Sequence, residues 1–583
     1  MEVVSLLKQG IPLVGLQAAP NGYREQLVPA SITEDELLQS AAWRRKSLMC
    51  QSKRFKPEEE AALLETTAEE VAKGFLEGPY SEQEISVLLE TEDWSLSPRF
   101  VLFQGTGGKI RVIDDAKKSS VNAAYSSTVK LQLQDVDYAA NMVLFLMSES
   151  AAAGISGDEW MGKTFDLSKA YKQLAILPAH QRHAVVGFPV SGTWRFYRSI
   201  SLPFGCTGSV YGFVRVSQAI WYIVTRLLSA VSSHYFDDFP TLERAPGCRV
   251  LSLAFSAVLD MLGWGHAKEG DKALNFAGAF DLLGVNFNLA WTPKGILQVT
   301  NKTTRIEKLC ALLDKVKSEG EITAAQASEL QGLLNFAIGF FSGKALKHLV
   351  AAFMPYADRV SLSKSGELQD LCAYAKSMLT SLGPRTHSTT GERRPILLFT
   401  DGAWEDGQAS AGAILVDGDF RIGCTITVPD VLVAHWLKHA GEQIISQIEL
   451  WALVAIRWHF RERLESRRLI SWIDNEAARV CAIKASSPSP TMRALTRALA
   501  DMEVAWPVFA WTERVCSFSN PGDLPSRHKL SEAMRRFNVS DGGIVDATAE
   551  LATTIVGLHE RPFSAALLFH RGTTPEHQAR NAN

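Results

Sequence analysis

The sequence predicts an α+β protein of several domains, and three observations support that fold class. The chain has 583 residues, more than a single hydrophobic core normally organises. Short β-prone runs broken by Gly and Pro fill residues 96–300, whereas helix-forming residues dominate 303–380. A segment with the composition of a linker, 381–395, then precedes a new strand start. We therefore expect folded parts on both sides of this linker.

The elements are predicted in chain order. Residues 1–95 should form an N-terminal helical extension, in which the helix-rich stretch "PEEEAALLETTAEEVAKGFLEGP" ends at Gly78-Pro79. The β-prone runs of 96–300 are "RFVLFQ", "KIRVID", "KTFDLS", "HAVVGFPV" and "WRFYRSI". The remaining boundaries are a helical part at 301–385, a linker at 386–395, a second unit at 396–545 and a tail at 546–583 that we expect to be disordered.

Composition excludes several classes of protein. Hydrophobic residues make up 46%, charged residues 21%, and the net charge is −3, so any basic groove must be local. The 8 cysteines include no C-x-x-C pair, which argues against a zinc knuckle or a disulfide framework and favours a reducing compartment. No signal peptide is recognised, and the most apolar run, "AIWYIVTRLLSAVSS", is short and contains Arg226. We expect an intracellular protein, in the cytoplasm, the nucleus or both, with no membrane partner.

The stretch "SHYFDDFPTLE" places Asp237 and Asp238 side by side among strand-forming residues. A surface turn is one explanation, because Asp favours turns. A bound cation is the other, because adjacent carboxylates repel each other and lose further stability when they are buried. A partner exists 71 residues upstream, where Asp166 follows the β-prone residues of "KTFDLS". Two such strand ends brought together need divalent metal to stay ionised, which is the arrangement used for in-line phosphoryl transfer.

These motifs resemble, in order, those of retroelement reverse transcriptases over roughly residues 95–300. "FDLSKAY" resembles motif A, "LPFGCTGS" motif B, "YFDD" motif C, "KALNFAGAFDLLGVNF" motifs D and E, and "KIRVIDD" the fingers motif. The resemblance implies a right-hand polymerase with fingers, an antiparallel palm sheet and, at 301–385, a helical thumb. It also implies an ordered set of site residues. The catalytic and metal-binding ones are Asp166, Asp237 and Asp238, and the nucleotide-binding ones are Lys109, Arg111, Tyr171, Phe204, Gly205 and Lys272.

Within that resemblance each residue has a stated role. Lys109 and Arg111 would contact the incoming triphosphate, and Tyr171 would exclude a ribose 2′-hydroxyl. Lys272 would give a proton to leaving pyrophosphate, although Lys268 lies in the same stretch. Pro240 follows the acid pair closely and suggests a short hairpin, since Pro cannot donate to a strand ladder. Alone, each motif is more often an ordinary turn, strand face or core aromatic.

Three basic residues on the expected thumb have two interpretations. Arg305, Lys308 and Lys315 stand at helical spacing. They could follow a phosphate backbone, or they could form an exposed amphipathic face.

The second unit carries its own acids. Asp401 ends an apolar strand, Glu449 lies near the start of an amphipathic helix, Asp474 ends another strand and Asp523 follows a Gly turn. Four acids can share one site only with cations. "TDGAW", "IELWAL", "DNEAA" and "NPGDLPSR" resemble ribonuclease H over about 396–530, which implies an α/β domain with a mixed five-stranded sheet. The four acids would then be its catalytic metal ligands.

The second unit departs from that pattern in one respect. Many ribonucleases H have a mobile His between the last two acids, but residues 475–522 contain none, and His528 follows Asp523. Nuclease activity could therefore be weak or absent. The segment "HFRERLESRRL" and its neighbours are rich in arginine and suggest a stripe that binds an RNA–DNA hybrid, with a solvent-exposed face as the alternative. Its members are Arg457, Arg461, Arg463, Arg467 and Arg468.

The two units together predict an RNA-directed DNA polymerase of a retroelement with linked ribonuclease H activity. The expected cofactor is Mg²⁺, two ions per active site, with Mn²⁺ possible, and the expected partners are an RNA template, a DNA primer, an RNA–DNA hybrid and dNTPs. "LPFG" and "NPGDLPSR" look most like DIRS-type retrotransposons. No recombinase or integrase signature is visible, as would be expected of a piece of a larger product. The alternatives are a decayed or domesticated element that binds nucleic acid without catalysis, and a polymerase whose nuclease is inactive.

Overall fold

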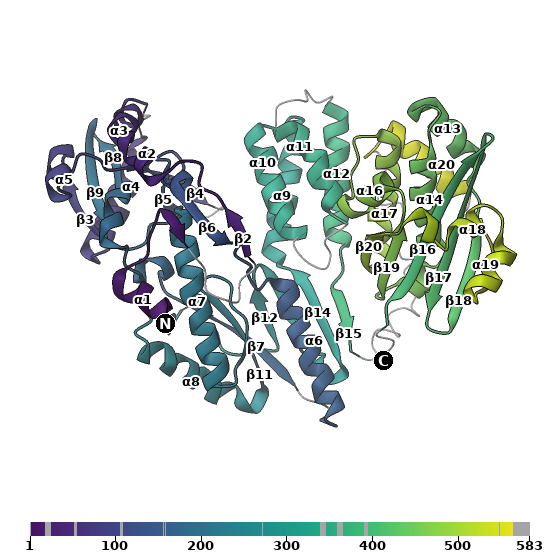
Figure 1. Ribbon diagram of the computed structural model, residues 1–583, viewed down its shortest axis with the longest axis horizontal. Coiled ribbons are helices and arrows are strands. Elements are labelled where there is room, and N and C mark those ends of the chain that lie inside the picture. Colours follow the sequence, from purple (N-terminus) through teal and green to yellow (C-terminus); the bar gives the residue numbers. More distant parts are fainter. Residues whose placement is uncertain are drawn as a thin grey trace. The chain divides into compact units, whose positions relative to one another are not determined.

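The computed structural model describes residues 2–17, 25–51, 55–104, 109–155, 157, 159–270, 272–338, 345–357, 365–389, 394–546, 549–563 and 569. The chain divides into two compact units, one made of residues 1–142 and 160–278 and the other of residues 143–159 and 279–583. Each unit contains helices and strands (Figure 1). The chain is therefore a mixed α/β multidomain protein, whereas the finer boundaries expected from the sequence stay predictions.

The described residues of the first unit form three sheets. The largest has the strand order β3-β9-β8-β4-β5. Its strands are β3 (Leu76–Tyr80), β4 (Leu96–Gln104), β5 (Lys109–Asp114), β8 (Val185–Val190) and β9 (Thr193–Ser199). The two smaller sheets have the orders β1-β6-β2 and β10-β11-β7. Their strands are β1 (Gly15–Gln17), β2 (Glu25–Val28), β6 (Tyr125–Val129), β7 (Trp160–Asp166), β10 (Val231–Ser232) and β11 (Asp238–Arg244).

Helices and an aromatic core support these sheets. The helices are α1 (Glu2–Gln9), α2 (Glu34–Gln39), α3 (Ala41–Cys50), α4 (Pro57–Ala72), α5 (Glu82–Leu88), α7 (Thr207–Leu227) and α8 (Cys248–Met261), while α6 (Val136–Ala152) continues beyond the first unit. Phe165 of β7 stacks on Phe255 of α8 with ring centroids 4.0 Å apart. Phe239 of β11 meets the same Phe255 edge-on, so α8 holds β7 and β11 together.

The first 95 residues differ from the helical extension expected. Their described part contains the five helices α1 to α5 but also β1, β2 and β3. β1 and β2 flank β6, and β3 pairs with β9, so this segment completes two sheets of the first unit. The helix α4 ends at Ala72, and Gly78 and Pro79 lie inside β3. The sequence pattern predicts the end of the helix at Gly78-Pro79. Because an edge strand tolerates Pro, these two residues belong to β3 instead.

The second unit begins with a four-stranded antiparallel sheet in the order β12-β13-β14-β15. Its strands are β12 (Ala279–Leu282), β13 (Val285–Asn288), β14 (Ile296–Asn301) and β15 (Arg385–Ser388). The start of the linker expected at 386–395 is a strand instead, because β15 pairs there with β14. In the described residues of the chain between β14 and β15, helices lie side by side (Figure 1). They are α9 (Thr303–Glu319), α10 (Ala324–Ile338), α11 (Lys347–Ala357) and α12 (Ser365–Ser381).

A six-stranded mixed sheet follows, in the order β20-β19-β16-β17-β18-β21. Its strands are β16 (Ile396–Glu405), β17 (Gln408–Asp417), β18 (Phe420–Ile426), β19 (Arg468–Ile473), β20 (Phe509–Arg514) and β21 (Ser540–Val545). The expected sheet had five strands. β21 is the sixth; it lies parallel to β18 and carries two glycines among its six residues, a composition that hides its strand character.

Eight helices accompany this sheet within the described residues. They are α13 (Asp430–Ala440), α14 (Ile445–His459), α15 (Arg461–Leu464), α16 (Glu476–Lys484), α17 (Pro490–Ala505), α18 (Asp523–Ser526), α19 (Leu530–Phe537) and α20 (Ala549–Glu560). α14 is buried along its length and forms the centre of the core of this sheet. None of the helices in the described ranges is long and apolar enough to cross a lipid bilayer.

Helix α20 corrects the expectation of a disordered tail from 546 onward. It buries four apolar side chains, Leu551, Ala552, Ile555 and Leu558. Their spacing forms one apolar face, so burial against the core favours a helix where composition alone suggested disorder. Residues 564–568 and 570–583, to which the same expectation applies, lie outside the described residues.

Candidate functional site

The first acid cluster lies where β7 and β11 meet. The two strands are antiparallel, and Asp166 at the end of β7 stands opposite Asp238 at the start of β11. Asp237 directly precedes Asp238, and its backbone carbonyl accepts a hydrogen bond of 3.0 Å from the amide of Leu167, the residue after Asp166. The sheet register therefore brings together the three carboxylates of "FDLSKAY" and "YFDD".

A tight turn presents this acid pair. Tyr235 and Asp238 exchange backbone hydrogen bonds of 2.9 and 3.1 Å, and Phe236 between them has φ of 54°. A left-handed conformation is costly for a bulky side chain, so surrounding contacts must hold it. The Ser217 hydroxyl of α7 donates a hydrogen bond to the Phe236 carbonyl. Contrary to the expectation from the sequence, the hairpin is not short on the side of Pro240, because β11 has seven residues and Pro240 stands opposite Thr164 in its ladder with β7. The short strand is β10, before the turn, with two residues.

Burial and mutual repulsion make this cluster electrostatically unfavourable when it carries no cation. Burial, with the charges of Asp237 and Asp166, raises the pKa of Asp238 to about 7. Burial and the Asp166 charge also raise the pKa of Asp237, and Lys272 opposes that rise. At neutral pH the three carboxylates therefore favour a positive charge beside them.

Lys272 supplies such a charge. Its ammonium lies 2.5 Å from a carboxylate oxygen of Asp166. Partial burial disfavours the charged amine, but the contacts with Asp166 and its neighbours outweigh it and raise the pKa of Lys272. Lys268, the alternative in the sequence, pairs with Asp260 at 2.8 Å. The structure thus distinguishes two lysines that the sequence could not.

Aromatic rings stand next to the acids. Tyr171 is buried, with its ring stacked on Phe213 at 4.7 Å and tilted against Phe204 at 5.0 Å. Burial raises the pKa of the Tyr171 hydroxyl, and the nearby charge of Asp237 adds to the rise. Phe204 is exposed. Beside the acid cluster, the ring of Tyr171 is therefore packed among its neighbours, whereas the ring of Phe204 is exposed to solvent.

Gly205, the residue after Phe204, lies against the end of β5. It has φ of +87°, and a Cβ built on it would lie 2.8 Å from the carbonyl oxygen of Asp114. Asn122 fixes the loop from the other side, because its amide donates to the Gly205 carbonyl at 2.9 Å and its side-chain oxygen accepts from the Thr207 amide at 2.7 Å. Both the left-handed backbone and the close approach require glycine here.

The strand β5 carries the two expected triphosphate contacts. Lys109 and Arg111 stand at alternate positions and so share one face of this edge strand. Arg111 is exposed, while the side chain of Lys109 lies outside the described part of the structure. The strand is anchored by Asp114, which forms an ion pair of 2.8 Å with the buried Arg99. Within the described residues, no ion pair or hydrogen bond joins Arg111 to the acid cluster, so its role there stays a prediction.

The second acid cluster forms across two parallel strands. Asp474 directly follows the end of β19, but Asp401, which was expected to end its strand, lies inside β16, which continues to Glu405 as it pairs with β17. β16 and β19 pair in register with Phe399 opposite Trp472, so Asp401 and Asp474, two residues further along each strand direction, reach the same edge. Glu449 comes from α14. A Cβ on Gly402 would lie 2.8 Å from Ile448 and 3.1 Å from the Glu449 amide, so glycine lets α14 approach β16 closely. Carboxylate oxygens of all three acids lie within 4.8 Å of one another.

This cluster is more deeply buried than the first. Burial and the charges of Asp474 and Asp401 raise the pKa of Glu449 to about 10. Burial, with the charges of Asp474 and Asp523, raises the pKa of Asp401 to about 6, although a Ser526 hydrogen bond opposes the rise. One oxygen each of Glu449 and Asp474 is buried without a hydrogen-bond partner among the described residues. Such atoms suit a cation ligand.

Asp523 stands apart from the other three acids. It starts α18 and accepts a hydrogen bond of 2.8 Å from Arg527. Asp401 is instead contacted by two residues that the sequence interpretation missed, Ser526 at 2.5 Å and Asn520 at 3.2 Å. Both belong to "SNPGDLPSR", so the signal was the polar residues on either side of Asp523. Asp401, Glu449 and Asp474 therefore come together directly. Asp523 affects this cluster through its negative charge, which helps to raise the pKa of Asp401.

The expected arginine stripe does not form a single face. Arg457 is buried and pairs with Glu503 of α17 at 3.1 Å. Arg463 and Arg467 both bind Asp417, at 2.8 and 2.7 Å. The five arginines also lie on different elements, with Arg457 in α14, Arg463 in α15 and Arg468 at the start of β19, so the expected stripe on one helix is wrong. Binding of a hybrid by these residues stays a prediction. Composition could not reveal acids that are distant in sequence.

The basic residues of α9 are also partnered. Arg305 donates to the Gly284 carbonyl at 2.6 Å, and Lys308 pairs with Glu329 at 2.7 Å. Lys315 lies 3.9 Å from Glu319. Of the two interpretations of α9, these contacts favour the amphipathic face over a phosphate track.

A prediction follows for Glu449. Its pKa of about 10 in the folded chain exceeds the usual value of 4.5, so the folded state holds this proton more tightly than the unfolded chain. The stability that the protonated carboxyl contributes is therefore complete below pH 4.5 and is lost as the pH rises toward 10. Glu449→Gln should raise the Tm of metal-free protein by about 3 °C or more at pH 8.

Thermal unfolding with a chelator at several pH values between the two pKa values checks this. The matched control is Glu442→Gln, an exposed acid just before the same helix. An equal Tm change in both variants, or a lower Tm for Glu449→Gln, would contradict the assignment of a buried carboxyl that is costly to ionise.

Comparison with known proteins gives limited guidance. No protein-family model matches the chain, and no curated protein matches it. A solved structure of the foamy viral protease–reverse transcriptase in complex with double-stranded DNA is similar, with 12% sequence identity and a TM-score of 0.39. The match covers 88% of this chain and 77% of that chain. A likeness at this TM-score is too weak to assign a fold or a function, so both must rest on the residues themselves.

Proposed function

We propose that the chain is an RNA-directed DNA polymerase with a linked nuclease that acts on the RNA strand of RNA–DNA hybrids. The observation that carries the proposal is the convergence of Asp166, Asp237 and Asp238 at the junction of β7 and β11. A surface turn would leave such acids exposed and apart. Here two are raised in pKa by burial and mutual repulsion.

The donor set fits divalent cations of the Mg²⁺ type. All the atoms offered are carboxylate oxygens, which hard cations prefer. Asp166 and Asp237 would hold the ions, with Asp238 beside them. When bound, Mg²⁺ would activate the attacking 3′-hydroxyl and neutralise charge on the leaving group.

The chain's own residues would position the nucleotide. Lys272, whose ammonium lies beside Asp166 and whose pKa is raised there, would give a proton to the leaving pyrophosphate. Arg111, exposed on β5, is suited to grip a phosphate in a bidentate manner, with Lys109 two positions away on the same strand face. The packed ring of Tyr171 would meet the sugar, and exposed Phe204 with Gly205 would support the base pair.

The second cluster supports the nuclease part of the proposal. Asp401, Glu449 and Asp474 gather their oxygens within 4.8 Å, and two of those oxygens have no hydrogen-bond partner among the described residues. Ser526 and Asn520 would hold Asp401 in its orientation. Asp523 would join as the fourth ligand on releasing Arg527.

The alternative that retains the polymerase and lacks the nuclease has one specific observation in its favour. Residues 475–522 contain no histidine. The carboxylate of Asp523 is instead bound by Arg527 in an ion pair of 2.8 Å. Proton transfer and product release in that site would then differ from those of the family it resembles. A decayed element is less well supported, because both clusters keep their acids.

The Tyr171 ring gives a prediction about sugar selection. If it blocks a 2′-hydroxyl, Tyr171→Val should raise ribonucleotide incorporation relative to deoxynucleotides by about tenfold or more, since one steric contact amounts to 1.4 kcal/mol or more. The measurement is single-nucleotide primer extension with matched dNTP and rNTP. Tyr197→Val, a buried tyrosine of β9, controls for general destabilisation. Unchanged selectivity in active Tyr171→Val would refute the gate.

The function itself is tested by offering the protein a DNA primer on an RNA template, and separately on a DNA template, with Mg²⁺ and dNTPs. The proposal predicts extension on the RNA template. Tight binding of the primer–template without any extension would favour the decayed element instead.

A further inference from the structure

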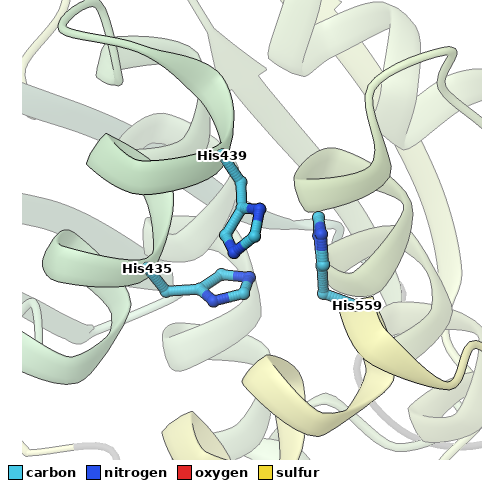
Figure 2. Close-up of side chains that lie close together, drawn as sticks. All are labelled: His435, His439 and His559. Atoms are coloured by element: carbon cyan, nitrogen blue, oxygen red, sulfur yellow. The ribbon is translucent and has the colours of Figure 1, made fainter.

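Three histidines from two helices point toward one another in the second unit (Figure 2). His435 and His439 stand four residues apart on α13, so they share one face of that helix. His559 comes from the last turn of α20. The two helices are far apart in sequence, so only the fold brings this set together.

The geometry is compact. One ring nitrogen from each histidine lies within 4.8 Å of the others. The ring centroids are 4.5 Å apart for His435 and His439, 4.6 Å for His435 and His559, and 4.5 Å for His439 and His559. Zn–N bonds of about 2.0–2.1 Å in a tetrahedron place ligand nitrogens roughly 3.3 Å apart. Small side-chain rotations therefore suffice to bring the three nitrogens around one ion.

Unsatisfied nitrogens point to a ligand. His435 Nε2 and His559 Nδ1 are buried and have no hydrogen-bond partner among the described residues. Buried polar atoms normally have a partner, so each unpaired nitrogen needs an explanation. A shared cation would satisfy both at once, whereas ring stacking alone would leave them unpaired.

The surroundings of His435 and His559 favour the neutral imidazole, which is the form that binds metal. Burial and the neighbouring histidines lower the pKa of His435. Burial, His439 and Arg493 lower the pKa of His559. Lys438 and Arg493 add positive charge nearby, and Glu560 adds a negative one.

We propose that His435, His439 and His559 form a binding site for Zn²⁺ or a similar imidazole-preferring transition metal, with a water molecule as the fourth ligand. Nitrogen donors select such ions over Mg²⁺, which prefers the oxygens of the two acid clusters. The site joins the last turn of α20 to α13. A metal bound here would tie the last turn of α20 to α13 and so help to hold α20 against the core of the second unit.

The packing of α20 agrees with that role. The helix buries Leu551, Ala552, Ile555 and Leu558, which form an apolar face along its length. His559 follows directly after the last of these, at the end of the helix that is most prone to fray. A metal bond at this point would prevent fraying of the terminal turn and so stabilise the whole helix.

The test uses the full chain without a histidine tag, at pH 7.5, with excess Mg²⁺ to occupy the acid clusters. Zn²⁺ is titrated against a chromophoric chelator, and Tm is measured with and without Zn²⁺. We expect one tight equivalent and a Tm increase, because a ligand that binds only the folded state stabilises it. Co²⁺ in place of Zn²⁺ should give a visible spectrum with nitrogen and oxygen ligands and no thiolate band.

Variants locate the site. His439→Ala changes an exposed residue, so folding should survive, and Zn²⁺ affinity should fall about a hundredfold or more together with the Tm increase. His435→Ala should behave alike. His459→Ala, an exposed histidine at the end of α14, is the matched control and should bind as wild type does.

Three results would overturn the proposal. One is the absence of a stoichiometric Zn²⁺ ion in the wild type. Another is full affinity retained in both His439→Ala and His435→Ala. The third is loss of the ion in Asp401→Asn, which would place it in the carboxylate cluster instead.

Discussion

Asp166→Asn should reduce primer extension by about a thousandfold or more, because loss of one shared metal ligand removes several kcal/mol of transition-state stabilisation. Asp166 faces Asp238 across the β7–β11 ladder and contacts Lys272. The substitution preserves shape and removes one negative charge from a crowded cluster, so the fold should persist. Nucleic-acid binding, which needs other surfaces, should remain within a few-fold.

The measurement pairs single-turnover extension with fluorescence anisotropy of a labelled primer–template. Asp260→Asn is the matched control, because Asp260 is an exposed acid of α8 that pairs with Lys268 and lies outside the cluster. Full extension by Asp166→Asn would remove this residue from the catalytic set. Equal losses in both variants would show a structural effect instead.

The second large effect is expected at Asp401. Asp401→Asn should abolish cleavage of the RNA strand in a hybrid, with a fall of about a thousandfold or more, while primer extension stays near wild type. The residue is 4% exposed and is held by Ser526 and Asn520 in a cluster with Glu449 and Asp474. It belongs to the second unit, whereas Asp166 belongs to the first. The two activities should therefore separate.

Cleavage is followed with end-labelled RNA annealed to DNA, and extension with labelled primer, in parallel reactions. Asp419→Asn, an exposed acid in the turn between β17 and β18, is the control. If the wild type extends primers but leaves the hybrid intact, the nuclease is inactive and the ion pair of Arg527 with Asp523 becomes its first explanation. Cleavage retained in Asp401→Asn would contradict the assignment of this cluster.

Some of the acids were accessible from the sequence because they stand within or just after an apolar, β-prone run, whereas Glu449 lies in the helix α14 and Asp523 starts α18. Asp166 is the last residue of β7, and Asp474 directly follows β19, whereas β16 continues past Asp401 to Glu405. The strand register explains why these acids meet their partners. Parallel or antiparallel pairing carries the ends of such runs to a common edge. The helices α9 and α10 were also expected, since their apolar spacing is regular.

Contacts between residues distant in sequence were not accessible. Lys272 and Lys268 are equivalent in the sequence, and only the fold places one on Asp166 and the other on Asp260. Arg457 looks like part of a basic stripe until Glu503, 46 residues away, is seen to neutralise it. A charge pattern does not encode its partners, so its function depends on packing.

Short or unusual elements were missed for a different reason. β21 contains Gly542 and Gly543, and β3 contains Gly78 and Pro79, residues that disfavour strands in isolation. Both form because a neighbouring strand offers its edge. The His-x₃-His spacing of α13 was the signal for the third cluster, but it acquires meaning only once α20 brings His559 to it.

The central claim, that Asp237 and its neighbours form a polymerase site linked to a separate nuclease site, is tested most directly in one reaction. A DNA primer and an end-labelled RNA template are incubated with Mg²⁺ and dNTPs, using wild type and Asp237→Asn. The account predicts that the wild type extends the primer and cleaves the RNA, and that Asp237→Asn cleaves the RNA of a preformed hybrid without extending the primer. Primer extension by Asp237→Asn at the wild-type rate would contradict the account.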